Sequence, residues 1–485
     1  MGMRICRKLT ALLLAVTLLA GFAFAEDMIV PDGGVDAEVD AELVEEIDGL
    51  DLTIEDTDLV IPEPVANTGD DATAIKIDSK NFPAKAFRDY VKAHFDADGD
   101  NELSKAEADA VTEIILRSRE QYDNGEGSLT CTTLKGIEHF VNLWKLEAVG
   151  CGLTTLDVSK NVNLVHLDCK DNNIKKLDVS KNRELTFLVC EENPLGALDV
   201  SKNTKLVVLG CHSNKLKALD VSRNTKLEEL YCSDNQLEKL VVSKCPKLVM
   251  LSCFNNKMTA LDVTKNTKLE TLHCGPNKLK KLDVSKCTKL IYLECLENQL
   301  TSLDVSKCTK LEELFAYRNK LKKLDVSKNT KLKKLFCQGN QLDSLNVSKN
   351  TKLTLLGCEE NQLNALDVTK NTKLEMLSCG QNKLKKLNVA KNAKLWALLC
   401  SSNKLTALNV SKNTKLEYLM TDGNAIPKID IGKCPKLQDA LKLKKQANKK
   451  TVQWGTEEEY GFNVRVSVSK ATKLTAGSKV LYKGK

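Results

Sequence analysis

Residues 219–240 read LDVSRNTKLEELYCSDNQLEKL, and close copies of this stretch fill most of the 485-residue chain. The leucine or isoleucine that opens each copy recurs every 21 residues, without insertion, from Leu156 to Ile429. A fixed period of this size is typical of a solenoid, in which each turn covers the apolar faces of its neighbours.

Each copy contains a second, shorter repetition. In residues 164–185 the pattern L-x-x-L-x-C-x-x-N is followed ten residues later by I-x-x-L-x-V-x-x-N. The L-x-C and L-x-V triplets have the alternation of short strands, with inward residues two apart. Because successive turns stack, we expect a mainly β fold with two short parallel sheets, one per half-repeat.

An asparagine follows the last apolar residue of each half, where the chain must turn. Its amide carries two donors and an acceptor, so a stack of such residues can satisfy the backbone groups of buried turns. The column in the L-D-V half begins at Asn161 and is interrupted by cysteine at four positions. The column in the L-x-C half has no interruption, and we expect it to form a structural ladder: Asn172, Asn193, Asn214, Asn235, Asn256, Asn277, Asn298, Asn319, Asn340, Asn361, Asn382, Asn403 and Asn424.

The pattern L-x-x-L-x-C-x-x-N-x-L resembles a leucine-rich repeat over residues 143–438, and its nested form resembles the short IRREKO-type subclass. Together with the acidic loop described below, it is similar to secreted leucine-rich-repeat proteins of anaerobic, often gut-dwelling, bacteria. The resemblance implies a solenoid that binds proteins or surface glycans, as internalins bind host receptors. It brings no shared catalytic residue, and fold alone does not identify a partner.

Eleven cysteines share one inward position of the L-x-C half, from Cys169 to Cys400. Alanine or threonine takes the same position elsewhere, which indicates a small apolar filler. The alternative is that these cysteines form disulfides, but adjacent parallel strands hold their side chains too far apart for a disulfide. Seventeen cysteines remain after the predicted signal peptide, and an odd number cannot all pair within one chain. We therefore expect free thiols, with Cys131 and Cys151 as the pair best suited to a bridge, and no zinc site, because clustered spacings are absent from the sequence.

The outward positions of the L-x-C half vary from turn to turn and include aromatic residues of the kinds that dominate binding energies. They predict a binding surface for a protein or glycan, against the alternative of neutral drift on a solvated sheet. The residues assigned to it are Tyr231, Phe254, His273, Tyr292, Phe315, Tyr317, Phe336, Trp396 and Tyr418.

The other half of each turn is uniform and basic. One column, from Lys160 to Lys433, is Lys or Arg in fourteen turns, and a second, from Lys205 to Lys436, is Lys in twelve. An anionic polymer such as teichoic acid or mucin glycan could lie along these columns. The alternatives are solubility with Asp–Lys pairing, or contact with the chain's own acidic segment; specific nucleic-acid binding is not expected, because aromatic residues are not interleaved.

Residues 96–107 read DADGDNELSKAE and match the spacing of an EF-hand loop. This pattern predicts a structural Ca²⁺ site, since calcium prefers six or seven oxygen ligands, and the alternative is an acidic turn that binds nothing. Asn101 replaces the usual glycine. The expected ligands are Asp96, Asp98, Asp100, Ser104 and Glu107 with the Glu102 carbonyl.

The chain ends complete the predicted domain organisation. Residues 1–25 have a basic start, an apolar run and Ala23-Phe24-Ala25, which is typical of a secretory signal peptide. We expect an acidic disordered linker over 26–75, an EF-hand-like cap over 76–115, the solenoid over 116–438 and a C-terminal cap over 439–485. The later residues contain no stretch apolar enough for a membrane span, and five scattered His offer no catalytic group, so we expect a secreted or surface-associated protein that is not an enzyme.

Overall fold

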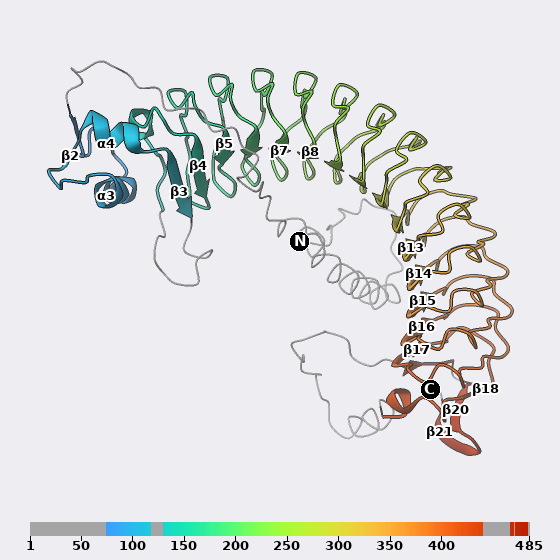
Figure 1. The fold of residues 1–485 in the computed structure, drawn as a ribbon. Coiled ribbons are helices and arrows are strands. Elements are labelled where there is room, and N and C mark those ends of the chain that lie inside the picture. Colours follow the sequence, from blue (N-terminus) through green and yellow to red (C-terminus); the bar gives the residue numbers. More distant parts are fainter. Residues whose placement is uncertain (1–73, 118–129, 440–465, 470, 484–485) are drawn as a thin grey trace, which may run out of the picture. The chain divides into compact units, whose positions relative to one another are not determined.

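A stack of 21-residue turns makes up most of the chain in the computed structural model (Figure 1). The structure describes residues 74–117, 130–439, 466–469 and 471–483, all within one compact unit of the chain. The predicted signal peptide, nearly all of the acidic linker and residues 440–465 of the expected C-terminal cap lie outside the described residues.

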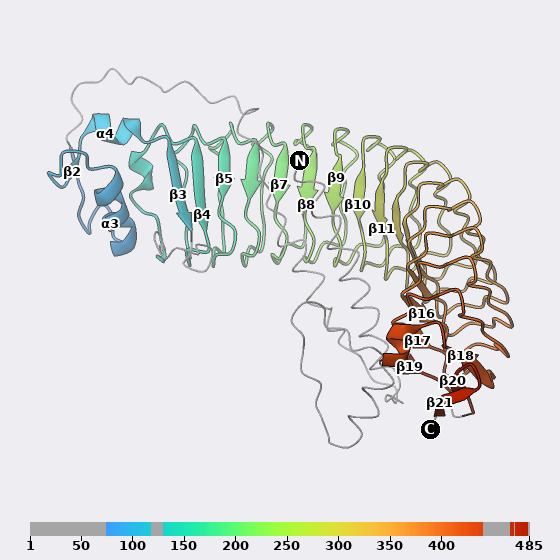
Figure 2. The ribbon, with the colours of Figure 1, turned by 60° about the horizontal axis from the view of Figure 1, so that its bottom comes forward.

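The L-x-C half of every turn forms one strand of a sixteen-stranded sheet, which Figures 1 and 2 show as a row of neighbouring arrows. The pairing is parallel throughout, and from β4 to β17 it has a constant offset of 21 residues, so that Leu230 faces Leu251 and Leu251 faces Leu272. The sheet runs in chain order from β3 to β17 and ends with β19. Its strands are β3 (Glu113–Arg117), β4 (Lys145–Val149), β5 (His166–Asp168), β6 (Phe187–Val189), β7 (Val208–Gly210), β8 (Glu229–Tyr231), β9 (Met250–Ser252), β10 (Thr271–His273), β11 (Tyr292–Glu294), β12 (Glu313–Phe315), β13 (Lys334–Phe336), β14 (Leu355–Gly357), β15 (Met376–Ser378), β16 (Ala397–Leu399), β17 (Tyr418–Met420) and β19 (Val466–Ser467).

The core is a set of apolar columns that run through the stack. In the turn that contains β8, Val221, Leu230 and Cys232 are fully buried, and their equivalents in the other turns form one continuous cluster. No turn can bury its apolar residues alone, so each is stabilised mainly by its two neighbours. This arrangement confirms the predicted mainly β solenoid.

The prediction of a second sheet in the L-D-V half is wrong, because the backbone groups there are used locally. The N–H of Ser201 donates to Oδ1 of Asp199 at 2.8 Å, and the N–H of Asn203 donates to the Val200 carbonyl at 3.0 Å. One backbone hydrogen bond per turn remains between neighbours, such as Lys215 N–H to the Leu195 carbonyl at 3.0 Å. A single bond per turn makes no ladder, so this half of one turn is extended but does not form a sheet with the same half of the next.

The asparagines of the L-x-C half form the ladder that their spacing suggests. Nδ2 of Asn298 donates to the carbonyls of Cys274 at 3.0 Å and Leu296 at 3.0 Å, while its Oδ1 accepts the N–H of Leu279 at 2.9 Å. Each such side chain therefore joins two turns. It supplies hydrogen bonds to backbone groups that have no sheet partner where the chain bends after the strand.

The second asparagine column is less completely satisfied. Nδ2 of Asn203 donates to the Val179 and Asn182 carbonyls at 2.9 and 2.8 Å, but its Oδ1 is buried without a partner. Where cysteine replaces this residue, the thiol donates in the same direction, as Cys245 Sγ does to the Val221 carbonyl at 3.5 Å. The substitution therefore keeps the donor and removes an acceptor that has nothing to bind.

A small helical segment covers the first turns. It contains α3 (Lys85–His94), α4 (Lys105–Ala110), and the strands β1 (Ile75–Lys76) and β2 (Glu102–Leu103), which pair antiparallel. Phe87 and Val91 of α3 are buried, and the ring of Phe95 packs edge-on against Phe140 at 5.3 Å. One 3₁₀ turn, Ile137–His139, comes directly before Phe140 in the chain.

The last turns continue into a three-stranded sheet made of β18 (Lys428–Asp430), β20 (Lys473–Ala476) and β21 (Lys479–Lys483). The hydroxyl of Thr472 donates to the Ile426 carbonyl at 2.6 Å and ties this sheet to the stack. Among the described residues, no helix has the length and apolar character needed to cross a bilayer.

Candidate partner-binding surface

We call the outward-facing residues of the sixteen-stranded sheet the strand face. They occupy every second position of β4–β17 and the residue that follows each inward cysteine, as Tyr231 and Ser233 do around Cys232. Because neighbouring strands are about 4.8 Å apart, side chains of adjacent turns lie in contact across this face. This is the surface on which the sequence varies.

A row of aromatic rings crosses four consecutive strands of the strand face. Ring centroids are 4.6 Å apart for His273 and Tyr292, 5.3 Å for Tyr292 and Phe315, and 5.3 Å for Phe315 and Phe336, with the last pair nearly parallel. Phe315 and Phe336 are partners in the parallel register, whereas His273 and Tyr292, and Tyr292 and Phe315, meet diagonally across adjacent strands. The row is therefore a continuous contact between side chains of four turns.

The expectation of exposed aromatics is wrong for five of the nine predicted binding residues. The half-exposed members are His273, Tyr292, Tyr317 and Trp396. The buried members are Tyr231, Phe254, Phe315, Phe336 and Tyr418.

Small neighbours explain part of this burial. Phe336 is 0% exposed because it lies over Gly357, where an added Cβ would sit 2.7 Å from Cδ1 of the ring. Trp396 and Tyr418 likewise pack edge to face at 5.6 Å. Ring packing within the face, rather than contact with solvent, therefore determines how these residues lie.

Histidine side chains lie beside glutamate carboxyl groups on the strand face. Nε2 of His212 is 2.9 Å from Oε2 of Glu191, and Nδ1 of His273 is 3.0 Å from Oε2 of Glu294. Desolvation raises the pKa of the neighbouring carboxyl of Asp168 to about 6. The strand face therefore holds some of its ionisable groups in a desolvated setting, in which a charged ligand group would interact strongly with them.

A second group of polar residues on β13–β15 was missed by the sequence analysis. Glu359, Gln338 and Ser378, which we call the Glu359 cluster, are 1%, 6% and 0% exposed. Burial raises the pKa of the Glu359 carboxyl to about 7. The only signal in the sequence is a glycine one or two positions from each polar residue, namely Gly339, Gly357 and Gly380, which a single chain gives no reason to single out.

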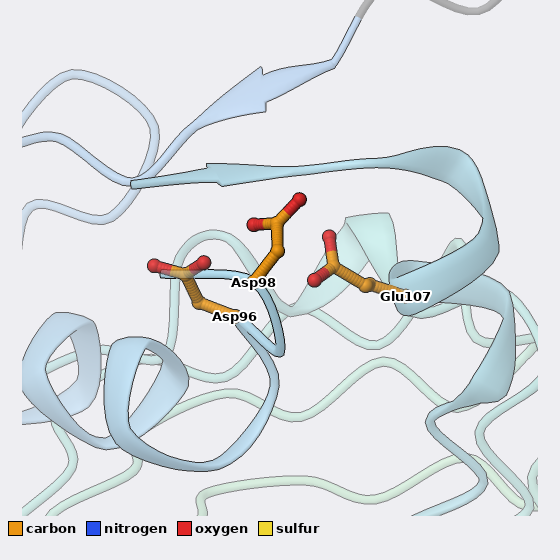
Figure 3. Close-up of side chains that lie close together, drawn as sticks. All are labelled: Asp96, Asp98 and Glu107. Atoms are coloured by element: carbon orange, nitrogen blue, oxygen red, sulfur yellow. The ribbon is translucent and has the colours of Figure 1, made fainter. Parts of the chain in front are cut away.

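The acidic loop brings three of its predicted ligands together. Carboxylate oxygens of Asp96, Asp98 and Glu107 lie within 4.8 Å of one another, and Figure 3 shows all three side chains directed to the same region. Oδ1 of Asp96 is buried without a partner. Oxygen donors of this kind and number fit a hard cation such as Ca²⁺.

The remaining predicted ligands of the loop are engaged locally. Oδ1 of Asp100 accepts the N–H of Glu102 at 2.7 Å, and Ser104 caps α4 by accepting the N–H of Glu107 at 3.2 Å. Hydrogen bonds from the Ser104 and Ala97 N–H groups lower the pKa of Glu107. Asn101 has φ of 69°, the left-handed conformation that replaces the usual glycine.

On the other half of the turns, both lysine columns are exposed along their whole length. The aspartates beside them accept hydrogen bonds within their own turns, as Asp199 does from Ser201, and these bonds lower the pKa of Asp199. Ion pairs join some lysines of the second column to glutamates one turn away, for example Lys247 to Glu228 at 4.0 Å. The aspartate column therefore serves mainly to shape the turn.

All seventeen cysteines of the described residues are buried and free of disulfides. The N–H of Cys131 donates to the Cys151 carbonyl at 2.9 Å, so these two residues are neighbours without being bridged. Burial raises the pKa of Cys232 to about 12, which keeps its thiol protonated. In the structure the column is core packing.

The repeating strand, the asparagine ladder and the short turns define a leucine-rich-repeat solenoid. The chain is similar to the functional domain of InlJ from Listeria monocytogenes, which includes a cysteine ladder: the two are 35% identical, with a TM-score of 0.70, over 76% of this chain and 80% of that one. The chain therefore belongs to the bacterial internalin-type leucine-rich-repeat proteins.

Two further solved structures share the fold at lower identity. They are a leucine-rich-repeat protein of Leptospira interrogans (22% identical, TM-score 0.57, 70% of this chain and 90% of that one) and the internalin InlF of Listeria monocytogenes (21%, 0.50, 73% and 93%). The sequence matches no protein-family model, and no curated protein is significantly similar to it.

Proposed function

We propose that the protein is a secreted or surface-associated adhesion protein that binds a protein or glycan partner on its strand face. The observation that carries this proposal is the contrast between the two halves of each turn. The L-D-V half repeats almost unchanged, whereas the strand face of the same turns changes residue type at nearly every step. A uniform scaffold with one varied face is what a binding solenoid requires, and catalysis is not part of the proposal.

Two matched variants test this proposal. The first replaces the half-exposed Tyr292, Tyr317 and Trp396 by Ala; the second replaces the exposed lysines of the same turns, Lys286, Lys307 and Lys391, by Gln. Both are compared with the unmodified chain on an array of extracellular proteins and surface glycans. Loss of binding in the first variant alone supports the strand face, and loss in the second alone overturns it.

The second candidate function is binding of an anionic polymer along the lysine columns. The observation in its favour is that the aspartates beside these columns are occupied in their own turns, so that most of the exposed lysines keep their charge available. Such binding falls steeply with salt, because it releases counterions. Titration with teichoic acid or sulfated glycan at about 50 and 200 mM salt, a range that spans strong to weak screening, separates this candidate from the first.

We also propose that the loop over residues 96–107 holds a structural Ca²⁺ ion. Asp96, Asp98 and Glu107 would supply its carboxylate ligands, and the unpartnered Oδ1 of Asp96 supports this assignment. The ion would join α3 to α4 and so stabilise the cover over the first turns. Isothermal titration with CaCl₂ tests this assignment, and an unchanged heat in a Glu107→Gln variant would refute it.

Export is the last part of the proposal. Residues 1–25 carry the features of a secretory signal peptide, and we propose cleavage after Ala25. Mass spectrometry of the protein recovered from culture medium should give an N-terminus at Glu26. A mature protein that still begins at Met1 would contradict this reading.

A further inference from the structure

The Glu359 cluster lies across three adjacent strands in the second half of the sheet. Phe336, Gly357 and Ser378 are in register on β13, β14 and β15, and Gln338 and Glu359 follow the inward cysteines of β13 and β14. These strands are neighbours in Figure 1. The cluster is therefore a local feature of the strand face and not a set of distant residues.

Backbone contacts place the three polar side chains beside one another. The N–H of Gly339 donates to the Glu359 carbonyl at 3.1 Å, and the N–H of Cys358 donates to the Ser378 carbonyl at 2.8 Å. Residues nineteen apart meet in this way elsewhere on the face, since the hydroxyls of Ser233 and Ser252 lie 2.8 Å apart. The Ser378 hydroxyl lies near the Glu359 carboxyl without completing a hydrogen bond.

Within the described residues, five buried polar atoms of this cluster have no hydrogen-bond partner. They are both carboxyl oxygens of Glu359, both amide atoms of Gln338 and the hydroxyl of Ser378. A buried polar atom without a partner costs about 1–3 kcal/mol, and a charged one costs more. A concentration of five in one place needs an explanation beyond folding.

The residues that flank the cluster have no polar side chains. Phe336 and Gly357 flank the cluster on one side, where Oε1 of Gln338 would lie 3.2 Å from a Cβ placed on Gly357, and Gly380 follows on the other side. Ser378 stands between the inward Leu377 and Cys379, so it faces outward. A ligand on the strand face would therefore approach the cluster from the outward side of β13–β15.

The charge of the strand face favours a cationic ligand. Residues 228–234 and their equivalents in fourteen successive turns, which comprise the strand face and the positions that flank it, contain 18 Asp and Glu against 5 Lys and Arg, a net charge of −13. Two of these five basic residues, Lys333 and Lys334, lie on the turn that contains Gln338. The lysine columns of the same turns carry the opposite sign. A basic partner is therefore attracted to the strand face and repelled by the other half of the turns.

We propose that the Glu359 cluster is the subsite of the strand face that takes an arginine or lysine side chain of a protein partner. This inference rests on the proposed function and narrows it to a partner with a basic surface segment. The Glu359 carboxylate accepts from the guanidinium or ammonium group, and Oε1 of Gln338 and Oγ of Ser378 accept its remaining N–H groups.

A neutral sugar fits these atoms less well. Its hydroxyls could bond the amide and the carboxylate, but they gain nothing from the net negative charge of the surrounding face. An arginine can donate through the five N–H groups of its planar guanidinium and is also attracted by the net negative charge of the surrounding face. A glycan at the same place is therefore an outcome of the test and not a second proposal.

The test uses the full chain and two fluorescent peptides, one with three arginines spaced by glycine and serine and one with citrulline, the neutral isostere, at the same positions. Binding is measured by anisotropy for the unmodified chain, for Glu359→Gln and for Glu360→Gln. Glu360 is the next residue along the chain, is exposed, and carries the same charge, so it controls for the general field. We expect preference for the arginine peptide, and a loss of about tenfold or more only in Glu359→Gln, as removal of a charge-assisted bond implies.

Equal losses in the two variants would overturn the inference, because the cluster would then be only part of a diffuse field. Equal binding of the citrulline peptide would also overturn it, as would a neutral glycan that binds the unmodified chain in a Glu359-dependent manner. If neither peptide binds while the Tyr292, Tyr317 and Trp396 variant still loses partners on the array, this inference fails and the proposed function stands. Loss of array binding in the lysine variant alone would refute the proposed function itself.

Discussion

The substitution Glu359→Gln should stabilise the folded protein in neutral to mildly alkaline solution. Burial raises the pKa of this carboxyl from its ordinary value of 4.5 to about 7, so the folded state holds a proton that the unfolded chain releases between these values. Stability is therefore lost as the pH rises from 4.5 to 7 and stays low above 7. The difference corresponds to about 3 kcal/mol at pH 8 and to less than about 1 kcal/mol at pH 5.

Glutamine keeps the shape of the side chain but cannot ionise, so this pH-dependent cost is absent from the variant. Urea denaturation followed by circular dichroism at pH 5 and pH 8, with Glu360→Gln as control, measures the effect. We expect a large gain in the urea midpoint for Glu359→Gln at pH 8, a small one at pH 5, and little change in the control at either pH. A gain of equal size at both pH values would refute the assignment of a buried, protonated carboxyl.

Three further predictions concern the cover, the ladder and the thiols. Addition of about 5 mM Ca²⁺ should stabilise the N-terminal cover by about 1–2 kcal/mol, as for extracellular calcium modules, and calorimetry should show this gain in Glu113→Gln but not in Glu107→Gln. Replacement of Asn298 by Cys should cost about 3 kcal/mol, because it removes the Oδ1 acceptor and replaces the two N–H donors of the amide by one weak S–H donor. Asn266→Cys should cost only about 1 kcal/mol, since Oδ1 of Asn266 has no partner and cysteine already occurs in that column. Equal urea midpoints of the two variants would contradict this difference. The buried thiols should react with Ellman's reagent only after unfolding, and rapid labelling of several thiols in the native protein would show that the column is accessible.

The sequence was sufficient to predict the repeating architecture. A strict 21-residue period, the L-x-C alternation and the unbroken asparagine column each impose a contact between successive turns, and the structure contains those contacts. The prediction of a second sheet was wrong, because the alternation of apolar residues does not show which hydrogen bonds the polar residues of the L-D-V half make. Asp199 and its equivalents take the N–H of the residue two positions on, so the L-D-V half closes on itself instead of pairing with its neighbours.

The details of the strand face could not be predicted in the same way. Whether Phe336 is exposed depends on Gly357, and the surroundings of Glu359 depend on Gln338 and Ser378, which are 21 and 19 residues away in the chain. Periodicity shows which positions are outward, but the side chain of each is oriented by residues of the turns before and after it. A site of this kind becomes visible only when the register is known.

The most direct test of the account is a comparison of partner binding by the two matched triple variants of the same turns. The account predicts that replacing Tyr292, Tyr317 and Trp396 by Ala weakens binding by about a hundredfold or more, as loss of several aromatic anchors implies. It also predicts that replacing Lys286, Lys307 and Lys391 by Gln changes the affinity by less than about threefold, because rim charges contribute little. Unchanged binding in the aromatic variant, together with a large loss in the lysine variant, would show that the strand face is not the binding surface.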